Sequence, residues 1–509
     1  MLGLGFVILS CSNDSEMVND NDNLGIEENI LPSNYKEITF EKNTNLNGRI
    51  TYFSNSYILP EIETKEEDRT FLNQVTSRND SGSYEIIAQV NNPTVNGYYL
   101  SATSIEYGDN HDKIYVTYHT KGAPIYGAIE VYDVQDLTNP TLQASYTSTN
   151  LEFNDIHISV GPSNNRQNKL YTAGNTDIDN NSFYSIYHRF NLNSGGEISF
   201  EGNGMKPKYL DYGTASSVMK YDSYVFLASA GDNGLIYPIR KNFSGGYGSR
   251  TWVTPGSALK FLDNYRGKMA ILTNGVFYLT DVRNNPLNYL NNFYWSESFP
   301  SFSPENGKNT IKIDHEKIYI AAGLNGIHQY TYDTEGVTLD FTSKSASYNT
   351  ISNCVDADSK YVYAANSSKL TIYKKSNPSE LYHYNFGDGS VNYVKAFKDL
   401  LFVAAGTDGI YILNKGELED NSNVIPNANF QVFNGIPNPN QYKLVVSKSI
   451  TGGSSKIHIS SQILTPNQST ATKYIYIIAN NQLNTSDIIY FGEQTRTSAE
   501  FSWDGTFSN

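Results

Sequence analysis

Cysteine is nearly absent from this 509-residue chain, which contains only Cys11 and Cys354. At most one disulfide can form, so a disulfide framework is excluded and the fold must be held by packing. Cys354 stands beside Val355 before a strand-like run, which indicates a small buried side chain without a chemical role.

Charge is also scarce, and basic charge most of all. Charged residues make up 17% of the chain, and 37 Lys and Arg against 52 Asp and Glu give a net charge of -15. A phosphate backbone would be repelled unless a basic stripe existed, and the sequence contains none. We therefore expect no nucleic-acid partner.

Metal and cofactor motifs are missing as well. The eight histidines are scattered without His-x-x-x-His spacing, and there is no Cys-x-x-Cys, so no zinc site is expected. Asp177 and Asp179 begin like a calcium loop, but the required glycine is absent and His188 stands where a glutamate would close the site. A solvated turn is the favoured interpretation of these two weak metal candidates, and we expect no cofactor and no catalytic residue.

Aromatic residues are abundant, with 40 Tyr and 24 Phe, a composition that favours many short strands. One strand pattern recurs at intervals of 39 to 56 residues: Lys113–Val116, Lys169–Ala173, Tyr224–Ala228, Lys268–Leu272, Lys317–Ala321, Tyr361–Ala365 and Leu400–Ala404. Intervals of about 40–50 residues are typical of one four-stranded propeller blade each. The sequence therefore predicts an all-β fold with a seven-bladed β-propeller over residues 83–417.

Turn residues follow most of these strands. Asn-Gly and Asp-Gly favour tight hairpins, because both residues tolerate positive φ; they occur at 233–234, 274–275, 325–326 and 408–409. The small residues of Ala321–Gly323 and Ala404–Gly406 suit either a crowded axis or a bend. Tyr84–Val90 precedes the first repeat and is expected to complete the seventh blade, which would close the ring.

Two blades carry a longer motif. Gly127–Val134 is followed by Asn139-Pro140, and Val276–Val282 by Asn285-Pro286. This pattern resembles the LVIVD-repeat propellers, and the resemblance covers residues 83–417. It implies the fold and no particular activity.

The N-terminal residues resemble an export signal. Residues 2–10 are uncharged and largely apolar, and they end at Ser10 before Cys11, which resembles the lipobox of bacterial lipoproteins. The resemblance implies a signal peptide over 1–10 and a lipid anchor on Cys11. Residues 11–35 are acidic and similar to the surface-export tether of Bacteroidota lipoproteins. We expect the extracellular face of the outer membrane, with a secreted protein as the alternative.

The two flanks of the propeller differ. Residues 36–82 have mixed charge, and Ile50–Phe53 is their clearest strand, so they are interpreted as an arm packed on the propeller. Residues 427–509 contain alternating runs that predict a small β-sandwich. Its end, Phe501–Asn509, resembles the Trp-Asp-Gly turn of the FlgD-type immunoglobulin-like domain. That family continues past the turn with a closing strand, which indicates a shortened domain here.

Aromatic residues near expected loops form the candidate binding surface, because they bring large contact area at low entropic cost. This set is Tyr107, Tyr118, Tyr126, Tyr212, Trp252 and Trp295, with His111 from the turn in blade one. Most of them should pack between blades. The function expected from the sequence is a non-enzymatic scaffold for an outer-membrane β-barrel protein or complex. The alternatives are a glycan hydrolase or lyase and capture of a glycan or other small ligand at the channel mouth.

Overall fold

The computed structural model describes side chains for residues 39–54, 56–58, 84–108, 111–159, 169–176, 185–199, 214–221, 224–230, 236–239, 259–283, 295–298, 308–334, 336–343, 350–378, 381–387 and 389–416. Further strand residues are described by their backbone alone. The chain divides into two compact units. The first comprises residues 1–56, 86–378 and 383–414, and the second comprises 57–85, 379–382 and 415–509.

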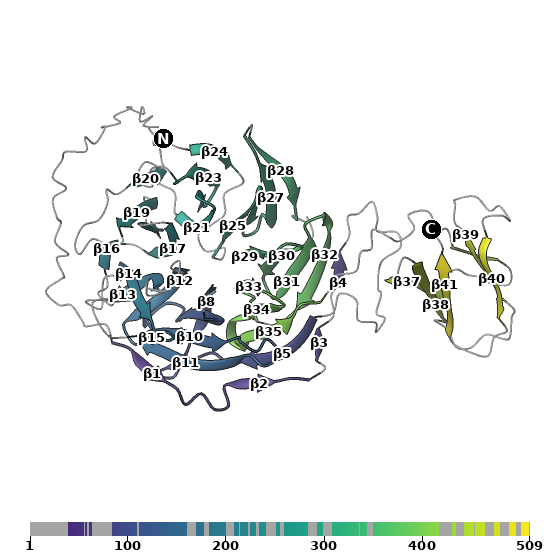
Figure 1. Ribbon diagram of the computed structural model, residues 1–509, viewed down its shortest axis with the longest axis horizontal. Coiled ribbons are helices and arrows are strands. Elements are labelled where there is room, and N and C mark those ends of the chain that lie inside the picture. The colour runs from purple at the N-terminus through teal and green to yellow at the C-terminus, as the bar shows by residue number, and fades with distance from the viewer. Residues whose placement is uncertain are drawn as a thin grey trace, which may run out of the picture. The chain divides into compact units, whose positions relative to one another are not determined.

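The first unit is a seven-bladed β-propeller, seen down its axis in Figure 1. Each blade is an antiparallel sheet, and in the first six blades the four propeller strands follow chain order from the axis outward. The first four blades are built from β8 (Ser101–Gly108), β9 (Lys113–His119), β10 (Gly127–Asp133) and β11 (Thr141–Ser148); β12 (Leu151–Ser159), β13 (Lys169–Asp177), β14 (Phe183–Leu192) and β15 (Ile198–Ser199), with β16 (Lys208–Tyr212) also on β14; β17 (Ala215–Tyr221), β18 (Tyr224–Ser229), β19 (Gly234–Arg240) and β20 (Thr251–Thr254); and β21 (Leu259–Tyr265), β22 (Lys268–Thr273), β23 (Val276–Asp281) and β24 (Phe293–Ser298).

The remaining three blades continue the circle. They are built from β25 (Ile311–Asp314), β26 (Lys317–Ala321), β27 (Ile327–Tyr332) and β28 (Val337–Thr342); β29 (Ser352–Ala357), β30 (Tyr361–Asn366), β31 (Lys369–Lys374) and β32 (Asn377–Asn385), with β4 (Glu61–Glu63) on β32; and β33 (Tyr393–Phe397), β34 (Leu400–Ala404) and β35 (Ile410–Asn414), joined by β5 (Tyr84–Val90). The prediction of an all-β, seven-bladed propeller is confirmed. All seven repeated patterns are the second strands of their blades.

Blade seven takes its fourth strand from the start of the propeller. Strand β5 pairs with β35, as the sequence predicts. Side chains from this end also hold the β34–β35 turn: the amide of Gln89 donates to the carbonyl of Asp408 at 2.8 Å, and that of Asn92 to the carbonyl of Gly406 at 2.6 Å. The first and last parts of the propeller thus share one sheet, which removes an open edge.

The arm adds strands to the outside of the ring. Strand β1 (Glu41–Asn43) pairs with β11, β2 (Ile50–Tyr52) pairs with β5, and β3 (Tyr57–Ile58) also pairs with β5. Arg49 reaches inward from the arm, and its guanidinium donates to the Glu130 carboxylate at 2.6 Å. Glu130 is fully buried and also accepts hydrogen bonds from Tyr118 at 2.7 Å and Tyr132 at 2.9 Å. The arm therefore supplies the cation that neutralises a buried carboxylate in blade one.

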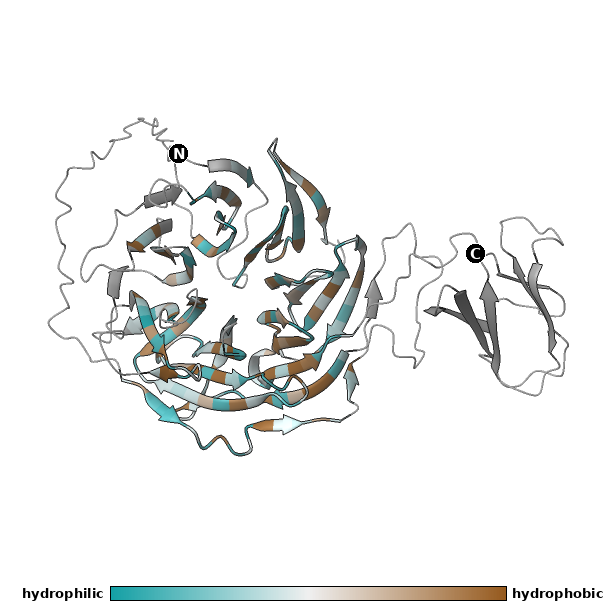
Figure 2. Cartoon of the chain, in the orientation of Figure 1, coloured by the Kyte–Doolittle hydropathy of each residue, from teal (hydrophilic) through white to brown (hydrophobic). Residues whose placement is uncertain are grey.

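Apolar side chains fill the spaces between blades, and Figure 2 shows brown residues recurring along the strands. One cluster joins blades one and two through Tyr115, Tyr146 and Phe153, with Phe40 of the arm packed against it. Another joins blades four and five. The small-residue segments bend the chain after the second strand: Gly323 has φ +58° and Gly406 has φ +57°. The small residues are therefore explained by the bend. Crowding at the axis does not explain them, because the strands at the axis are the first strands of the blades and these residues follow second strands.

The described strands from residue 430 onward form two three-stranded antiparallel sheets: β36 (Phe430–Phe433), β39 (Lys473–Ile478) and β40 (Ile488–Gln494); and β37 (Tyr442–Thr451), β38 (Ser454–Ile463) and β41 (Glu500–Phe507). The expected turn at Trp503-Asp504-Gly505 is wrong, because β41 runs through it with Asp504 opposite His458. The other described elements are the hairpin of β6 (Thr94–Val95) and β7 (Tyr98–Tyr99) and the 3-10 turn Gly406–Asp408. Within the described ranges, no helix has the length and apolarity to cross a membrane.

Candidate functional site

Seven equivalent positions face the axis near the ends of the innermost strands. Each is the residue opposite the third position of a repeated pattern, for example Glu106 opposite Tyr115 and Lys395 opposite Phe402. Around the ring the seven are Glu106, His157, Met219, Asp263, Lys312, Asp356 and Lys395. From blade four onward the sign of the charge alternates.

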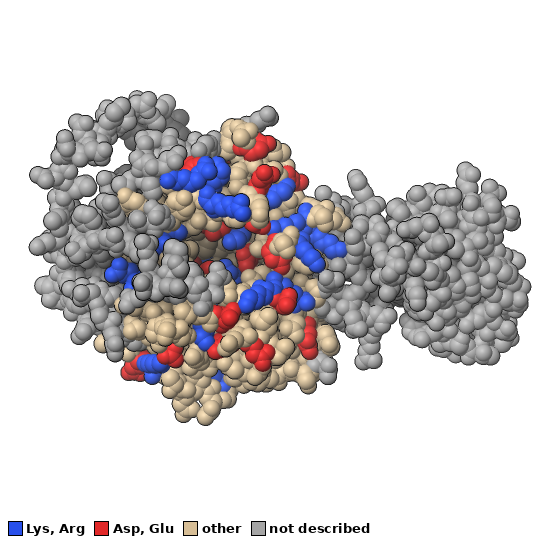
Figure 3. All heavy atoms as spheres, viewed as in Figure 1, with Lys and Arg blue, Asp and Glu red and all other residues tan. Residues whose placement is uncertain are grey.

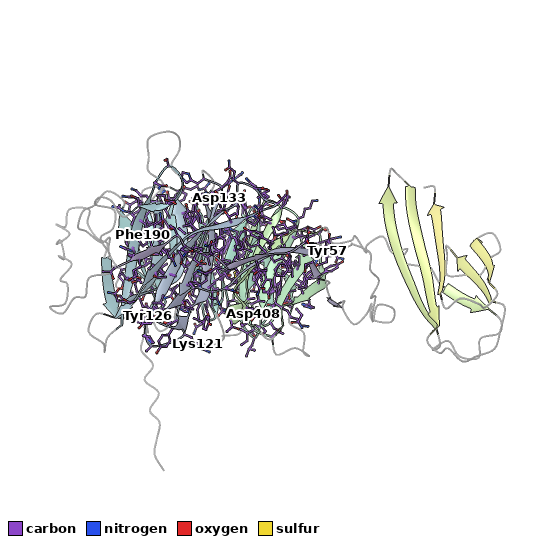
Figure 4. The ribbon with its side chains drawn as sticks, turned by 90° about the horizontal axis from the view of Figure 1, so that it is seen from below. Tyr57, Lys121, Tyr126, Asp133, Phe190 and Asp408 are labelled. Atoms are coloured by element: carbon purple, nitrogen blue, oxygen red, sulfur yellow. The ribbon has the colours of Figure 1, made fainter. Side chains whose placement is uncertain are left out.

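These residues line a central cavity of about 380 Å³. It lies toward the face on which the innermost strands end, because its lining comes from the second half of strands such as β12 (Asp155 to Ser159). Asp133 marks this face, since it is in register with Lys113 and with Gly108 at the end of β8. Figure 4 places Asp133 on this face and Lys121, Tyr126 and Asp408 on the opposite face. In Figure 3, basic and acidic side chains surround the hollow at the centre of the ring.

Ion pairs join neighbouring blades across the wall of the cavity. The Lys395 ammonium lies 3.0 Å from Glu106, and the Lys312 ammonium lies 3.5 Å from Asp263. Burial opposes the charge of Lys395, but Glu106 and Asp356 outweigh it and raise its pKa. The Asp263 carboxylate raises the pKa of Lys312, while burial raises the pKa of Asp263 itself.

The carboxylates also bind the backbone of the following blade. Asp263 accepts a hydrogen bond from the Ile313 amide at 2.8 Å, and Asp356 accepts one from the Ala396 amide at 2.9 Å. These first strands are not hydrogen-bonded to each other as neighbours in one sheet. Their free amides are satisfied by side chains, a device that fixes one blade against the next.

Asp155 is the most connected carboxylate of the cavity. One oxygen accepts from the Ser104 hydroxyl of blade one at 2.7 Å, and the other from the Ser217 hydroxyl at 2.6 Å and the Val218 amide at 3.0 Å, both of blade three. Only 2% of its side chain is exposed. A single buried carboxylate therefore joins three consecutive blades.

Lys308 closes the cavity on the side opposite Asp133. It precedes strand β25 of blade five, yet its ammonium donates to the carbonyls of Thr103 at 2.8 Å and Asn154 at 2.7 Å, in blades one and two. The ammonium lies 5.2 Å from the ring centre of Phe261 and 4.8 Å from that of Tyr393. Lys308 thus crosses the axis and forms, with these two rings, the floor of the cavity.

His157 is the wall residue with unused hydrogen-bonding capacity. In the part of the chain that the structure describes, neither ring nitrogen has a hydrogen-bond partner. Burial lowers its pKa, which Glu106 and Asp155 oppose only in part. The imidazole is therefore neutral near pH 7 and presents one donor and one acceptor.

A second titratable pair lies beyond the floor, near the opposite mouth. His119 Nδ1 is 4.0 Å from the Glu152 carboxylate, which accepts a hydrogen bond from the Asn175 amide at 2.6 Å. Burial lowers the pKa of His119 to about 4 and raises that of Glu152 to about 7. Near neutral pH the His119 imidazole is therefore uncharged, while the Glu152 carboxyl is about half protonated.

The candidate binding surface is dispersed. Tyr118 is wrong as a surface residue, since it lies in β9, is fully buried and donates to Glu130. Tyr107 packs on Phe397 at 3.7 Å between ring centres and donates to Asp112 at 3.1 Å. Its partners belong to blades seven and one, so its role is to pack between blades.

The other surface candidates lie on different parts of the propeller. His111 sits in the turn between β8 and β9, and burial lowers its pKa. Tyr126 lies on the opposite face, with its ring 5.6 Å from that of Tyr98. Tyr212, Trp252 and Trp295 lie in outer strands, not in loops. His111, Tyr126 and Trp295, whose side chains the structure describes, do not line the central cavity.

The metal, thiol and lipid candidates have different outcomes. Asp177 is the last residue of β13, and Asp179 lies outside the described residues. The described residues hold no cluster of three or more metal-ligating side chains. Cys354 is buried, as predicted, and burial raises its pKa to about 11. Cys11 lies outside the described residues.

No protein-family model and no curated protein sequence matches the chain. Among solved structures, it is similar to the inactive H270A virginiamycin B lyase from Staphylococcus aureus with quinupristin (12% identity, 64% of this chain, 98% of that chain, TM-score 0.42). It is also similar to Raptor from Chaetomium thermophilum (11% identity, 66% of this chain, 30% of that chain, TM-score 0.44) and to the designed protein Ika8 (9% identity, 63% and 98%, TM-score 0.36). Likeness at this level carries no information about function.

Proposed function

We propose that this chain is a non-enzymatic binding scaffold, held by a lipid on Cys11 at the extracellular face of the outer membrane. Its partner is an outer-membrane β-barrel protein or a complex built on one, in assembly, secretion or nutrient uptake. The apolar run before Cys11 and the acidic segment after it support the location. The closed ring supports the scaffold role, because a propeller presents loops on a rigid frame.

The observation that carries the non-enzymatic proposal is the use of the cavity carboxylates. Each of the four that line it already holds a bond to a neighbouring blade: Glu106 to Lys395, Asp155 to Ser217, Asp263 to Ile313 and Asp356 to Ala396. A general acid or base must instead be available to a substrate. The same commitment argues against the glycan hydrolase or lyase alternative.

Ion pairs at the rim support a rigid platform. Lys398 lies 2.8 Å from Asp112, which joins blades seven and one, and Lys375 lies 2.5 Å from Asp314, which joins blades six and five. Exposed pairs contribute little stability individually. They do fix the relative positions of the turns that a partner would contact.

We also propose finer assignments for the two folded regions. The propeller is of the LVIVD-repeat kind, supported by Gly127–Val134 and by the turn through Asn139-Pro140 that leads into β11. Residues 427–509 are an immunoglobulin-like sandwich, supported by two three-stranded sheets among their described strands.

Affinity purification from detergent-extracted membranes tests the scaffold role. The tagged full chain is expected to co-purify with a β-barrel protein identified by mass spectrometry, and an unrelated tagged lipoprotein from the same membranes is expected not to. Cys11→Ser should move the protein out of the membrane fraction. Recovery of the chain alone would contradict the partner, and membrane retention of Cys11→Ser would contradict the anchor.

A further inference from the structure

The central cavity has the size of a site for one small molecule. Its volume of about 380 Å³ falls in the lower part of the ~300–1,000 Å³ range of ligand pockets. Lys308 and the rings of Phe261 and Tyr393 form its floor, so a ligand would enter from the face that carries Asp133. A long polymer could not thread through the axis past the Lys308 ammonium.

The charges around the cavity cancel. The lining contains four carboxylates and three lysines, and Lys308 in the floor supplies a fourth ammonium: Glu106, Asp155, Asp263 and Asp356 against Lys220, Lys312, Lys395 and Lys308. This balance is local, because the whole chain has a net charge of -15. A charged ligand would have to separate existing ion pairs, such as the one between Lys395 and Glu106 at 3.0 Å, at a large desolvation cost.

A neutral hydroxyl fits this wall without separating any pair. It donates to a carboxylate and accepts from an ammonium. Each carboxylate has about four lone-pair sites, so its bond to the neighbouring blade leaves room for a hydroxyl without making it a free acid or base, and alternating acids and lysines offer both partners at successive positions. The imidazole of His157, which has no hydrogen-bond partner among the described residues, adds a further donor and acceptor. Phe261 and Tyr393 provide apolar rings against which the C–H face of a sugar would pack.

We propose that this cavity binds a small neutral polyhydroxylated molecule, of the size of a mono- or disaccharide. The polar wall selects hydroxyl-rich ligands, and the floor sets the depth of entry. The site is separate from the partner-binding role above, so failure of either proposal leaves the other unaffected.

Isothermal titration calorimetry of the full chain tests the site with glucose, galactose, mannose, N-acetylglucosamine, maltose and trehalose. At least one is expected to give a saturable one-to-one isotherm, while glucuronate, glucosamine and glycine give none. Absence of binding by the whole neutral panel would overturn the proposal. Equal or tighter binding of a charged probe would overturn it as well.

Variants of His157 locate the binding. His157→Phe fills part of the cavity and should abolish the isotherm, whereas His157→Ala removes only the hydrogen bonds and should weaken affinity at least about tenfold. The matched control is His315→Ala, a histidine with 72% of its side chain exposed in the turn between β25 and β26, which should bind as the wild type does. Melting curves confirm that each variant is folded. Unchanged affinity in folded His157→Ala would place the sugar outside the cavity and refute the assignment.

Discussion

Asp155 is the residue whose removal should most weaken the inner ring. Its carboxylate accepts from Ser104 at 2.7 Å, from Ser217 at 2.6 Å and from the Val218 amide at 3.0 Å, and it lies 3.4 Å from the Lys308 ammonium. Asp155→Ala leaves these donors buried without an acceptor. Each hydrogen bond to a charged group contributes ~1.5–3 kcal/mol, and removal of one partner of a buried ion pair costs ~3–5 kcal/mol.

These contributions overlap, so we expect a loss of about 4 kcal/mol for Asp155→Ala. An unfolding entropy of ~2.1 cal/mol/K per residue, over a propeller of about 380 residues, converts this to a fall in Tm of about 5 °C. Asp155→Asn keeps the shape and one acceptor, and should lose about half as much.

Differential scanning calorimetry at one fixed scan rate is the assay, because a ring of this size is expected to unfold irreversibly. The control is Lys42→Ala, which removes a partly exposed pair with Glu197 at 3.2 Å and should lower Tm by about 1 °C or less. If Asp155→Ala melts within 1 °C of this control, the carboxylate does not hold the blades together and the reasoning fails.

Three further changes have defined outcomes. Arg49→Ala leaves the buried Glu130 without its cation and should lower Tm by about 4 °C in a calorimetric scan; no change would show that the arm does not stabilise blade one. Gly409→Ala adds a Cβ only 2.0 Å from the Val90 carbonyl at φ +86° and should lower Tm by about 2–3 °C in the same calorimetric scan; an unaltered Tm would contradict the close approach of β5. Glu152 has a folded pKa of about 7 against an ordinary 4.5, so folding takes up a proton and the wild type loses stability as pH rises from about 4.5 to 7. Glu152→Gln should therefore be more stable than the wild type by about 2–3 kcal/mol at pH 8 and equally stable at pH 4. An equal difference in Tm between the two proteins at both pH values would contradict this.

The ring itself was predictable because its evidence is local. The repeated strands carry their own alternation, and four of the seven, such as Lys317–Ala321, have an Asn-Gly or Asp-Gly turn within a few residues. Closure through Tyr84–Val90 followed from simple counting, since seven blades left one strand over. The buried state of Cys354 followed from its apolar neighbours.

The cavity could not be predicted in the same way. Its wall takes between one and five residues from each of seven strands that lie far apart in the sequence. The usable signal is register: the residue opposite the third position of each repeat, as Asp263 is opposite Ala270, faces the axis. The sequence around Lys308 gives no such signal. Its partners, the carbonyls of Thr103 and Asn154, belong to distant blades and come near it only when the ring closes.

The errors have physical causes. Tyr118 follows a strand-like run, where the sequence favours a nearby loop, but β9 continues to His119 because Glu130 and Tyr132 give the Tyr118 hydroxyl a buried partner. The motif at Trp503 suggested a turn, yet its backbone pairs with β38 over the whole of β41. In both cases tertiary pairing overrode a local pattern.

The central cavity with its alternating charges, and both functional proposals, require that β5 close the ring of seven blades. Hydrogen–deuterium exchange followed by mass spectrometry measures this directly. Peptides covering Ile86–Val90 should exchange as slowly as those from β34 and β35, because one cooperative sheet opens as a unit. Rapid exchange of Ile86–Val90 beside protected β34 and β35 would show an open ring and contradict the account.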